Sequence, residues 1–241
     1  MYINRTYRNF DKNENLIPFQ VSIKETDLYL KAQKNLEKEA RDLAFRYRSQ
    51  IENYILSHPA FEKSLVPLPY DDYAPLIVQE MLRASSLVGV GPMAAVAGAI
   101  AEFVGKSLLK YSSEVIVENG GDIFLSTAEK EIIVKIVAGA SPLSQKIGIK
   151  VLPSETPLGI CTSSGTVGPS LSFGKADAVT IVSPSTALAD SVATAVGNRV
   201  KKPDDIPFSL KVAESLSEIK GIIIIVGEKM GVWGNIELVK L

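Results

Sequence analysis

The chain has 241 residues and 26.0 kDa, with 46% hydrophobic and 22% charged side chains, which excludes a disordered or fibrous protein. Its 26 basic and 27 acidic residues give a net charge of −1, so the basic excess typical of nucleic-acid-binding proteins is absent. The single cysteine excludes an internal disulfide, and the single histidine excludes a histidine-based zinc site and argues against a Ser-His-Asp triad. We expect a single domain over residues 1–241, large enough to bury a core without disulfides.

The N-terminal residues are polar and lack the apolar core of a secretory signal. The most apolar stretch, 87–104, is rich in Gly and Ala and is interrupted by Glu102, which favours a buried helix over a membrane span. A single unpaired cysteine agrees with a reducing compartment. We therefore expect a cytoplasmic protein that binds a small-molecule ligand and has neither a nucleic acid nor a membrane as its partner.

The first third of the chain predicts two strands followed by two helices. Residues 2–8 and 18–24 alternate around a polar turn and indicate the strands. From Thr26 to about Ser57, apolar residues recur at helical spacing between charges, which predicts one long helix. His58 and the following proline end that helix, and a proline-rich connection leads to a second helix over about 75–84.

A third helix is expected after Pro92, because the first turn of a helix tolerates the missing N–H of proline. Along this helix one face carries only small residues: Ala94, Gly98, Ala101 and Gly105. Such a face allows another backbone or a flat ligand to approach closely. Tight packing of the helix on a sheet explains it without any ligand, and is the more common reason.

The second half of the chain predicts mostly strands, over residues 114–124, 131–139, 146–152, 159–183 (two strands around a loop), 221–227 and 232–241. Ser183 is expected to cap a helix that starts at Pro184 and stops at Gly197, and a short helix is expected near 209–218. Because several strands are linked as hairpins and others through helices, we predict an α+β fold with mixed sheets flanked by helices. Edge strands near both termini would permit a homodimer.

Asp190 and Thr194 form the first candidate site, because residues four apart on a helix point to one face. A carboxylate and a hydroxyl oxygen, completed by carbonyls and waters, suit Mg²⁺, which usually also binds substrate phosphates. An exposed Asp and a back-bonding Thr are the more common explanation for this spacing alone.

Two loops form the second and third candidate sites. Gly120, Gly121 and Asp122 lie at a strand break where the backbone can approach a ligand, although a plain turn explains the glycines equally well. After Cys161, the run Thr162-Ser163-Ser164-Gly165 offers hydroxyl and N–H groups that could hold a phosphate. It lacks the lysine of a P-loop, and a solvated loop is the alternative.

Cys161 is the only thiol of the chain. A lone cysteine is more often a small buried apolar residue than a nucleophile. Its position at the mouth of a polar loop nevertheless makes it a candidate catalytic residue, since nearby N–H groups would lower its pKa.

Several motifs in fixed order resemble a known family. ENGGDIF, TSSG and ALADSVATAV look like the shared elements of ApbE proteins, which are FAD:protein FMN transferases. A branch of ApbE-like proteins from archaea and anaerobic bacteria is closer, with VGPMAAVAGAIAE, VENGGDIF, CTSSGTVG, SFGKADAV and LADSVATAVGN nearly verbatim. The resemblance to this branch covers nearly the whole chain, and it implies an ApbE-like (T-fold-like) architecture.

The resemblance also implies roles for the candidate residues. Asp190 and Thr194 match the positions that bind Mg²⁺ beside the FAD pyrophosphate in ApbE enzymes. The GGD turn matches the flavin site, and the T-S-G loop matches the lining of the dinucleotide site. It therefore implies FAD or another nucleotide diphosphate, together with Mg²⁺, as cofactors, and a transferase-type ancestry.

Two departures from the ApbE pattern weaken the case for flavin transfer. The segment G-G-I-A-K-G-Y is replaced by a stretch without that lysine, and the histidine-containing segment after T-S-G is missing. Two alternatives therefore stay open. The branch is associated with sulfide assimilation into homocysteine in anaerobes, where Cys161 would carry a persulfide or contact a sulfur donor, and a non-catalytic binding or assembly module is the other reading.

Overall fold

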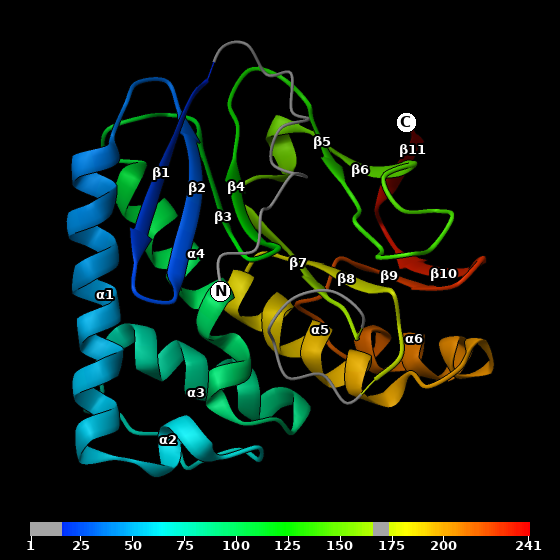
Figure 1. Cartoon of the computed structure of the whole chain (residues 1–241), viewed down its shortest axis with the longest axis horizontal. Helices are drawn as coiled ribbons and strands as arrows, with labels where there is room; N and C mark the ends of the chain where they lie inside the picture. Colours follow the sequence, from blue (N-terminus) through cyan, green and yellow to red (C-terminus); the bar gives the residue numbers. More distant parts are fainter. Residues whose placement is uncertain (1–15, 166–173) are drawn as a thin grey trace.

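Eight strands form one long antiparallel sheet in the computed structural model, which describes residues 16–165 and 174–241 (Figure 1). Neighbours follow the order β1-β2-β3-β4-β7-β8-β9-β10. The strands are β1 Ile17–Ile23, β2 Thr26–Ala32, β3 Val115–Asn119, β4 Asp122–Ser126, β7 Leu158–Ser163, β8 Ala178–Ser183, β9 Gly221–Val226 and β10 Lys229–Gly234. Every described strand pair is antiparallel, so the α+β prediction is confirmed and the chain returns between strands through hairpins and helical connections.

A second, three-stranded antiparallel sheet packs on one face of the long sheet. Its strands follow the order β11-β6-β5 and span β5 Ile132–Lys135, β6 Ile147–Val151 and β11 Glu237–Lys240. Between the two sheets lies an apolar cluster to which Ile149 of β6 and Ile223 of β9 contribute.

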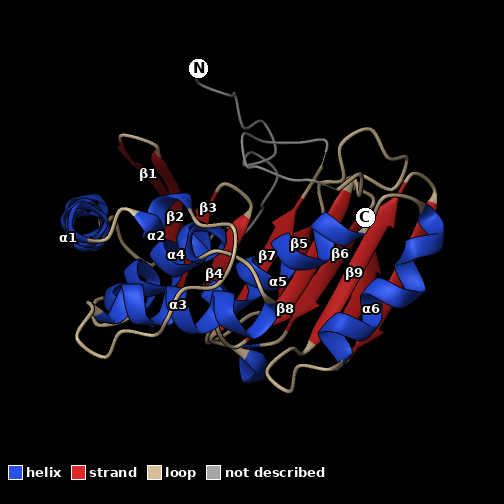
Figure 2. Ribbon diagram, turned by 90° about the horizontal axis from the view of Figure 1, so that it is seen from below, coloured by secondary structure: helices blue, strands red, loops and turns tan. Residues whose placement is uncertain are grey.

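Helices cover the opposite face of the long sheet (Figure 2). They are α1 Glu37–Ser57, α2 Ala60–Lys63, α3 Leu76–Val88, α4 Val96–Leu108, α5 Thr186–Arg199 and α6 Ile206–Glu214, with short 3₁₀ turns at η2 Pro92–Ala95, η3 Pro153–Glu155 and η4 Pro203–Asp205. The larger core lies between these helices and the sheet. On β8, Val179 and Ile181 belong to this core, whereas Ala178 and Val182 face the small sheet. Alternation with a period of two thus builds both cores from one strand.

The predicted helix from Thr26 begins too early. Residues 26–32 form β2, which pairs with β1 through a turn at residues 24–25, and α1 begins only at Glu37. Leu28, Leu30 and Ala32 are fully buried. This burial alternates with a period of two, as in a strand. The strand forms because β1 and β3, on either side, supply hydrogen-bond partners for its backbone N–H and C=O groups.

Two further boundaries differ from the prediction. The cap of α5 is Ser185, whose side chain accepts a hydrogen bond from the Leu188 amide, while Ser183 ends β8. The single strand predicted over 232–241 is divided at Gly234, whose φ of 102° bends the chain from the long sheet into the small one. The strand predicted over residues 2–8 lies outside the described residues.

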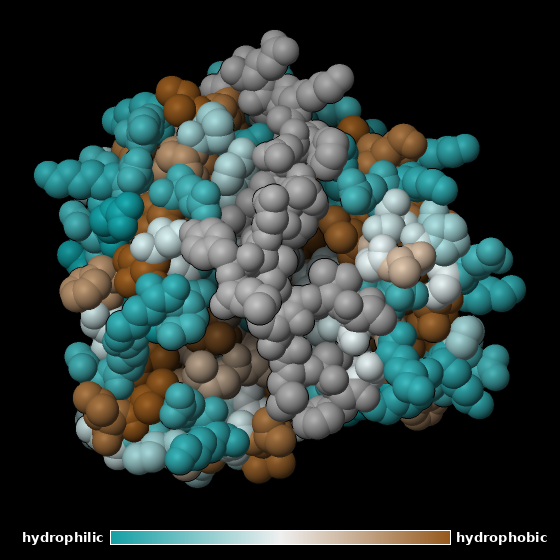
Figure 3. Space-filling view, in the orientation of Figure 1, coloured by the Kyte–Doolittle hydropathy of each residue, from teal (hydrophilic) through white to brown (hydrophobic). Residues whose placement is uncertain are grey.

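No single helix in the described parts of the chain is long and apolar enough to cross a membrane, although the bent pair Leu76–Val88 and Pro92–Leu108 passes by length and composition. On the surface seen in Figure 3, hydrophilic side chains cover most of the margins, and apolar atoms gather near α2 and its connection to α3. Exposed apolar side chains of that region include Leu65, Val66 and Tyr73.

Candidate functional site

Asp190 projects from α5 toward the first turn of α4. Its Oδ2 accepts a hydrogen bond from the Gly98 amide at 2.9 Å, and the Ala97 amide donates to the same carboxylate. Free N–H groups and the helix dipole make the start of a helix a favourable place for a negative charge. Asp190 therefore caps α4 although it lies 92 residues further along the chain.

Gly98 makes this approach of α4 and α5 possible. A Cβ at this position would lie 2.5 Å from the Thr186 carbonyl oxygen and 2.8 Å from Cβ of Asp190. Both distances are shorter than real contacts, so no larger residue fits without displacing a helix. The small-residue face of the predicted third helix thus serves helix packing here, and at Gly105 it accommodates the Phe124 ring.

Asp122 and Cys161 lie beside each other on neighbouring strands. They are paired in the register of β4 with β7, and Asp122 follows directly on the turn of Gly120 and Gly121. Both glycines have positive φ, 71° and 108°, as a two-residue hairpin requires. The turn itself is therefore explained by local geometry, and its effect is to place Asp122 next to the thiol.

The Cys161 thiol is buried between carboxylates. Its side chain has no solvent exposure, and Sγ donates to the Thr186 carbonyl oxygen at 3.3 Å. Burial raises the pKa of Cys161 well above its ordinary value, and the negative charges of Asp122, Asp190 and Glu102 raise it further. The low pKa expected from nearby N–H groups is wrong, because carboxylates rather than free amides surround the sulfur.

Desolvation also acts on Asp190, which is half-buried. It raises the pKa of this carboxyl to about 7, while the hydrogen bonds from Gly98 and Ala97 act in the opposite direction. The charged groups that raise the pKa of Cys161 are the carboxylates of Asp122, Asp190 and Glu102. The described surroundings of the thiol are therefore acidic.

Three residues of the Thr162–Gly165 segment, Thr162, Ser163 and Gly165, make contacts in different directions. The Thr162 hydroxyl bonds to Thr180 at 2.9 Å, on the face of β7 away from Cys161. Ser163 lies on the face of α5, where its Oγ would be 3.4 Å from a Cβ on Gly197. The amide of Gly165 donates to the Ala176 carbonyl oxygen. Residues 166–173, which continue this loop, lie outside the described ranges.

The residues present fit a Mg²⁺ ion. Asp190 offers a carboxylate that the amides of α4 leave partly available, since a carboxylate has about four lone-pair positions. Thr194 lies one turn further along α5, half-buried, and its hydroxyl has no hydrogen bond within the described chain. Among the residues that the structure describes, no three His, Cys, Asp or Glu side chains are grouped so that they could hold a metal ion. The remaining ligands of Mg²⁺ would therefore be backbone carbonyls, waters or substrate oxygens, as is usual for this ion.

Two further polar residues near the site make contacts that the sequence alone does not show. The side-chain amide of Asn119 donates to the Ala97 carbonyl oxygen at 3.1 Å and so links β3 to the start of α4. Glu102 is buried and accepts hydrogen bonds from the Thr186 and Ala187 amides at the start of α5. A charged residue within the most apolar stretch of the chain was the signal that could have found Glu102.

Comparison with known proteins agrees with this arrangement of elements. A protein-family model described as AbpE bacteria matches residues 8–219. The chain belongs to this family. It is also 42% identical over 227 residues to a UPF0280 protein of Methanococcus aeolicus, with 92% of this chain and 91% of that protein covered. A UPF0280 protein of Methanocaldococcus jannaschii is 42% identical over 228 residues, with 92% of each chain covered.

Solved structures of flavin transferases share the fold. The flavin transferase ApbE from Vibrio cholerae superposes with a TM-score of 0.57 at 13% identity, over 90% of this chain and 96% of that one. The flavinyl transferase ApbE of Pseudomonas stutzeri gives the same TM-score and identity, over 90% and 93% of the two chains. The ApbE-like architecture is therefore confirmed, and at this identity the likeness speaks for the fold alone.

Proposed function

We propose that this protein binds a flavin or another nucleotide diphosphate through Mg²⁺ held by Asp190 and Thr194. The observation that carries the proposal is the Asp190 carboxylate, which is held in place by the first turn of α4 and lies, with Asp122 and Glu102, near the Cys161 thiol. A bound cation would compensate the negative charges of Asp190 and Asp122. The fold shared with flavin transferases favours a flavin among the nucleotide ligands.

The charge of the site makes binding depend on the metal. A diphosphate would be repelled by Asp190 and Asp122, and the starts of α4 and α5 already accept carboxylates, so neither offers free amides to a phosphate. Mg²⁺ would bridge the protein carboxylate and the phosphate oxygens. Gly120–Asp122 and Thr162–Gly165 would line the rest of the ligand.

Flavin transfer to a protein is not part of the proposal. The only histidine, His58, ends α1, where its ring stacks on Tyr54 at 4.1 Å and Nδ1 lies 3.2 Å from the Tyr54 carbonyl oxygen. The sulfur alternative is not supported by the buried thiol of Cys161, whose raised pKa suppresses the reactive thiolate. The proposed function is therefore ligand binding, without the transfer reaction of the flavin transferases that share the fold.

A thermal-shift titration with FAD, FMN, ADP and ATP, each with and without Mg²⁺, tests this function. A ligand at a hundredfold excess over its dissociation constant stabilises the native state by about 2.7 kcal/mol, which raises Tm measurably. We expect a shift with FAD only when Mg²⁺ is present.

Asp190→Asn is the matched variant, because its amide oxygen can still accept from Gly98 while the metal-binding charge is lost. This variant should fold and show no Mg²⁺-dependent shift. A shift of the same size in Asp190→Asn, or one in wild type without any divalent cation, would contradict the proposed site.

A further inference from the structure

Helices α4 and α5 cap each other. The first-turn amides of α4 donate to Asp190 on α5, and the first-turn amides of α5 donate to Glu102 on α4. Gly98 lies beside Thr186 and Asp190, while Glu102, one turn further, reaches the very start of α5, so the two helices run antiparallel. Each helix thus places a carboxylate on the positive end of the other.

Glu102 makes the shorter and more buried of these contacts. Its Oε2 accepts from the Thr186 amide at 2.7 Å and from the Ala187 amide at 3.1 Å, and its residue is only 2% exposed. Its Oε1 accepts from Lys106, whose side chain is largely exposed. Hydrogen bonds to an ionised acceptor are stronger than neutral ones, and burial limits the competition from water.

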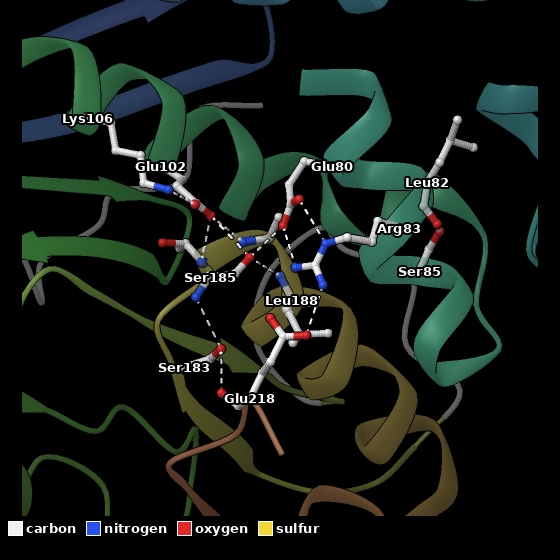
Figure 4. Close-up of polar contacts among 12 residues, drawn as sticks. Glu80, Leu82, Arg83, Ser85, Glu102, Lys106, Ser183, Ser185, Leu188 and Glu218 are labelled. Atoms are coloured by element: carbon white, nitrogen blue, oxygen red, sulfur yellow. Dashed lines mark hydrogen bonds and ion pairs between the residues drawn. The ribbon is translucent and has the colours of Figure 1, made fainter. Parts of the chain in front are cut away.

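A second carboxylate fixes the same end of α5. Ser185 caps α5 and donates to Glu80 Oε1 at 2.8 Å, and Arg83 holds Glu80 through two hydrogen bonds at 2.8 and 3.0 Å (Figure 4). Arg83 also bonds to Glu218 at 2.9 Å, which lies in the segment before β9. The start of α5 is therefore held by α3 and α4 together, through the side chains drawn in Figure 4.

Asp190 lies four residues beyond Thr186, about 6 Å along the axis of α5. An α-helix is stiff over one turn, so a shift of the start of α5 moves Asp190 by the same amount. Close contact at Gly98 leaves no room for the helix to move toward α4. The register of α5 on α4, and with it the position of Asp190, depends on the anchor at Thr186 and Ala187.

We propose that Glu102 is a positioning residue for Asp190, acting through the register of α5 on α4. The consequence for metal binding rests on the function proposed above. Residues that orient a metal ligand without touching the metal typically contribute about 10–100-fold to affinity. Glu102 would act in this way over one helical turn.

Hydrogen–deuterium exchange of the full-length metal-free protein tests the positioning directly. In Glu102→Gln the acceptor oxygen is retained and the charge is lost, so the fold should persist while the anchor weakens. We expect exchange at Thr186 and Ala187 to accelerate about tenfold, and exchange at Ala97 and Gly98, whose amides bond to Asp190, to accelerate with them.

Lys106→Gln is the matched control, because it removes the exposed partner of Glu102 and leaves both amide contacts in place. Exchange at Ala97 and Gly98 should stay at the wild-type rate in this variant. If Glu102→Gln fails to fold, Glu80→Gln loosens the same helix end through Ser185 and should accelerate the same four amides. Acceleration confined to Thr186 and Ala187 in the variant tested would overturn the inference.

Mn²⁺ binding, followed by electron paramagnetic resonance, measures the consequence for the site. We expect Mn²⁺ affinity to fall at least about tenfold in Glu102→Gln and to change less than about twofold in Lys106→Gln. Wild-type protein that binds no Mn²⁺ would contradict the proposed function, while the exchange at Gly98 would still decide the positioning. Equal Mn²⁺ affinity in wild type and in Glu102→Gln would overturn the positioning role of Glu102 and leave the proposed function intact.

Discussion

At the scale of single residues, the surroundings of Cys161 and Asp190 decide their chemistry. A lone thiol and a D-x-x-x-T spacing are weak signals by themselves, because both occur in sites that bind nothing. The structure brings the thiol and two carboxylates together from β4, β7 and α5. Burial then raises the pKa of both Cys161 and Asp190. The thiol stays protonated at physiological pH, whereas the carboxyl, with a pKa of about 7, gains or loses its proton within the physiological range.

Cys161 should be almost inert in the folded protein. Because its pKa is raised and its side chain is fully buried, the thiolate fraction at about pH 8 is far below that of a free thiol. Alkylation with iodoacetamide, followed by mass spectrometry, should proceed at least about a hundredfold more slowly than in the same protein unfolded in urea. Rapid labelling of the native protein would revive the sulfur-handling alternative.

Metal binding at Asp190 should depend on pH. With a pKa of about 7, the carboxyl binds a proton below neutral pH, and Mg²⁺ must displace it. We expect the apparent Mg²⁺ affinity, measured by calorimetry, to rise from about pH 6 to pH 8 and then to level off. Thr194→Ala should lower affinity by a similar factor across this range, since a hydroxyl does not titrate there. An affinity independent of pH would contradict the role of Asp190.

The same pKa affects the stability of the metal-free protein. A folded-state pKa raised above the unfolded value stabilises the protein at low pH, and that contribution is lost as the pH rises through about 7. Asp190→Asn removes this dependence. In urea denaturation, the stability of the variant relative to wild type should therefore increase from about pH 5 to pH 8, and a constant difference would argue against the raised pKa.

At the scale of secondary-structure elements, the approach of α4 to α5 is the critical contact. The sequence predicted a small-residue face on α4, and the structure shows Gly98 against the backbone of α5 and Gly105 against Phe124. The predicted helix over 26–57 shows the opposite outcome, because residues 26–32 became a strand once β1 and β3 were available to pair with them. Local periodicity is ambiguous where both periods fit, and tertiary pairing then decides.

Gly98→Ala should destabilise the protein by about 1–3 kcal/mol, because the new Cβ would lie 2.5 Å from the Thr186 carbonyl oxygen and push the helices apart. Gly197→Ala on α5 is the matched control, since among the described residues its Cβ would meet only Ser163, with Oγ at an ordinary 3.4 Å and Cβ at 3.7 Å. The higher helix propensity of alanine should make the control neutral or stabilising by up to about 1 kcal/mol. Thermal denaturation of both variants checks the contrast, and equal loss in the two would contradict it.

At the scale of the whole molecule, two cores share the long sheet. One lies against the helices and the other against the small sheet, and the strands β7, β8 and β9 contribute to both. Unfolding of one core therefore exposes strands that also form the other core. This arrangement predicts that the described sheets and helices unfold together.

Ile149→Ala in the small-sheet core should cost about 2–5 kcal/mol and Phe124→Ala in the helical core about 3–5 kcal/mol. Both should lower one common unfolding midpoint, because the two cores are coupled through the sheet. Far-UV circular dichroism and the fluorescence of Trp233, the only tryptophan, provide two probes of that transition. Separate midpoints for the two probes would contradict a single cooperative transition.

The sequence by itself determined the α+β class, most strands and helices, and the family, and it supplied the candidate residues for the proposed magnesium and diphosphate site. Hydrophobic periodicity, glycines and helix caps are local features, and local features can be read from the chain. Only the tertiary structure decided that Asp190 caps α4, that Glu102 caps α5, and that Cys161 is buried between carboxylates. These contacts join residues more than 80 positions apart in the first two cases, and the third depends on the register of β4 on β7. A pKa depends on the burial and charge of such neighbours, which no local pattern contains.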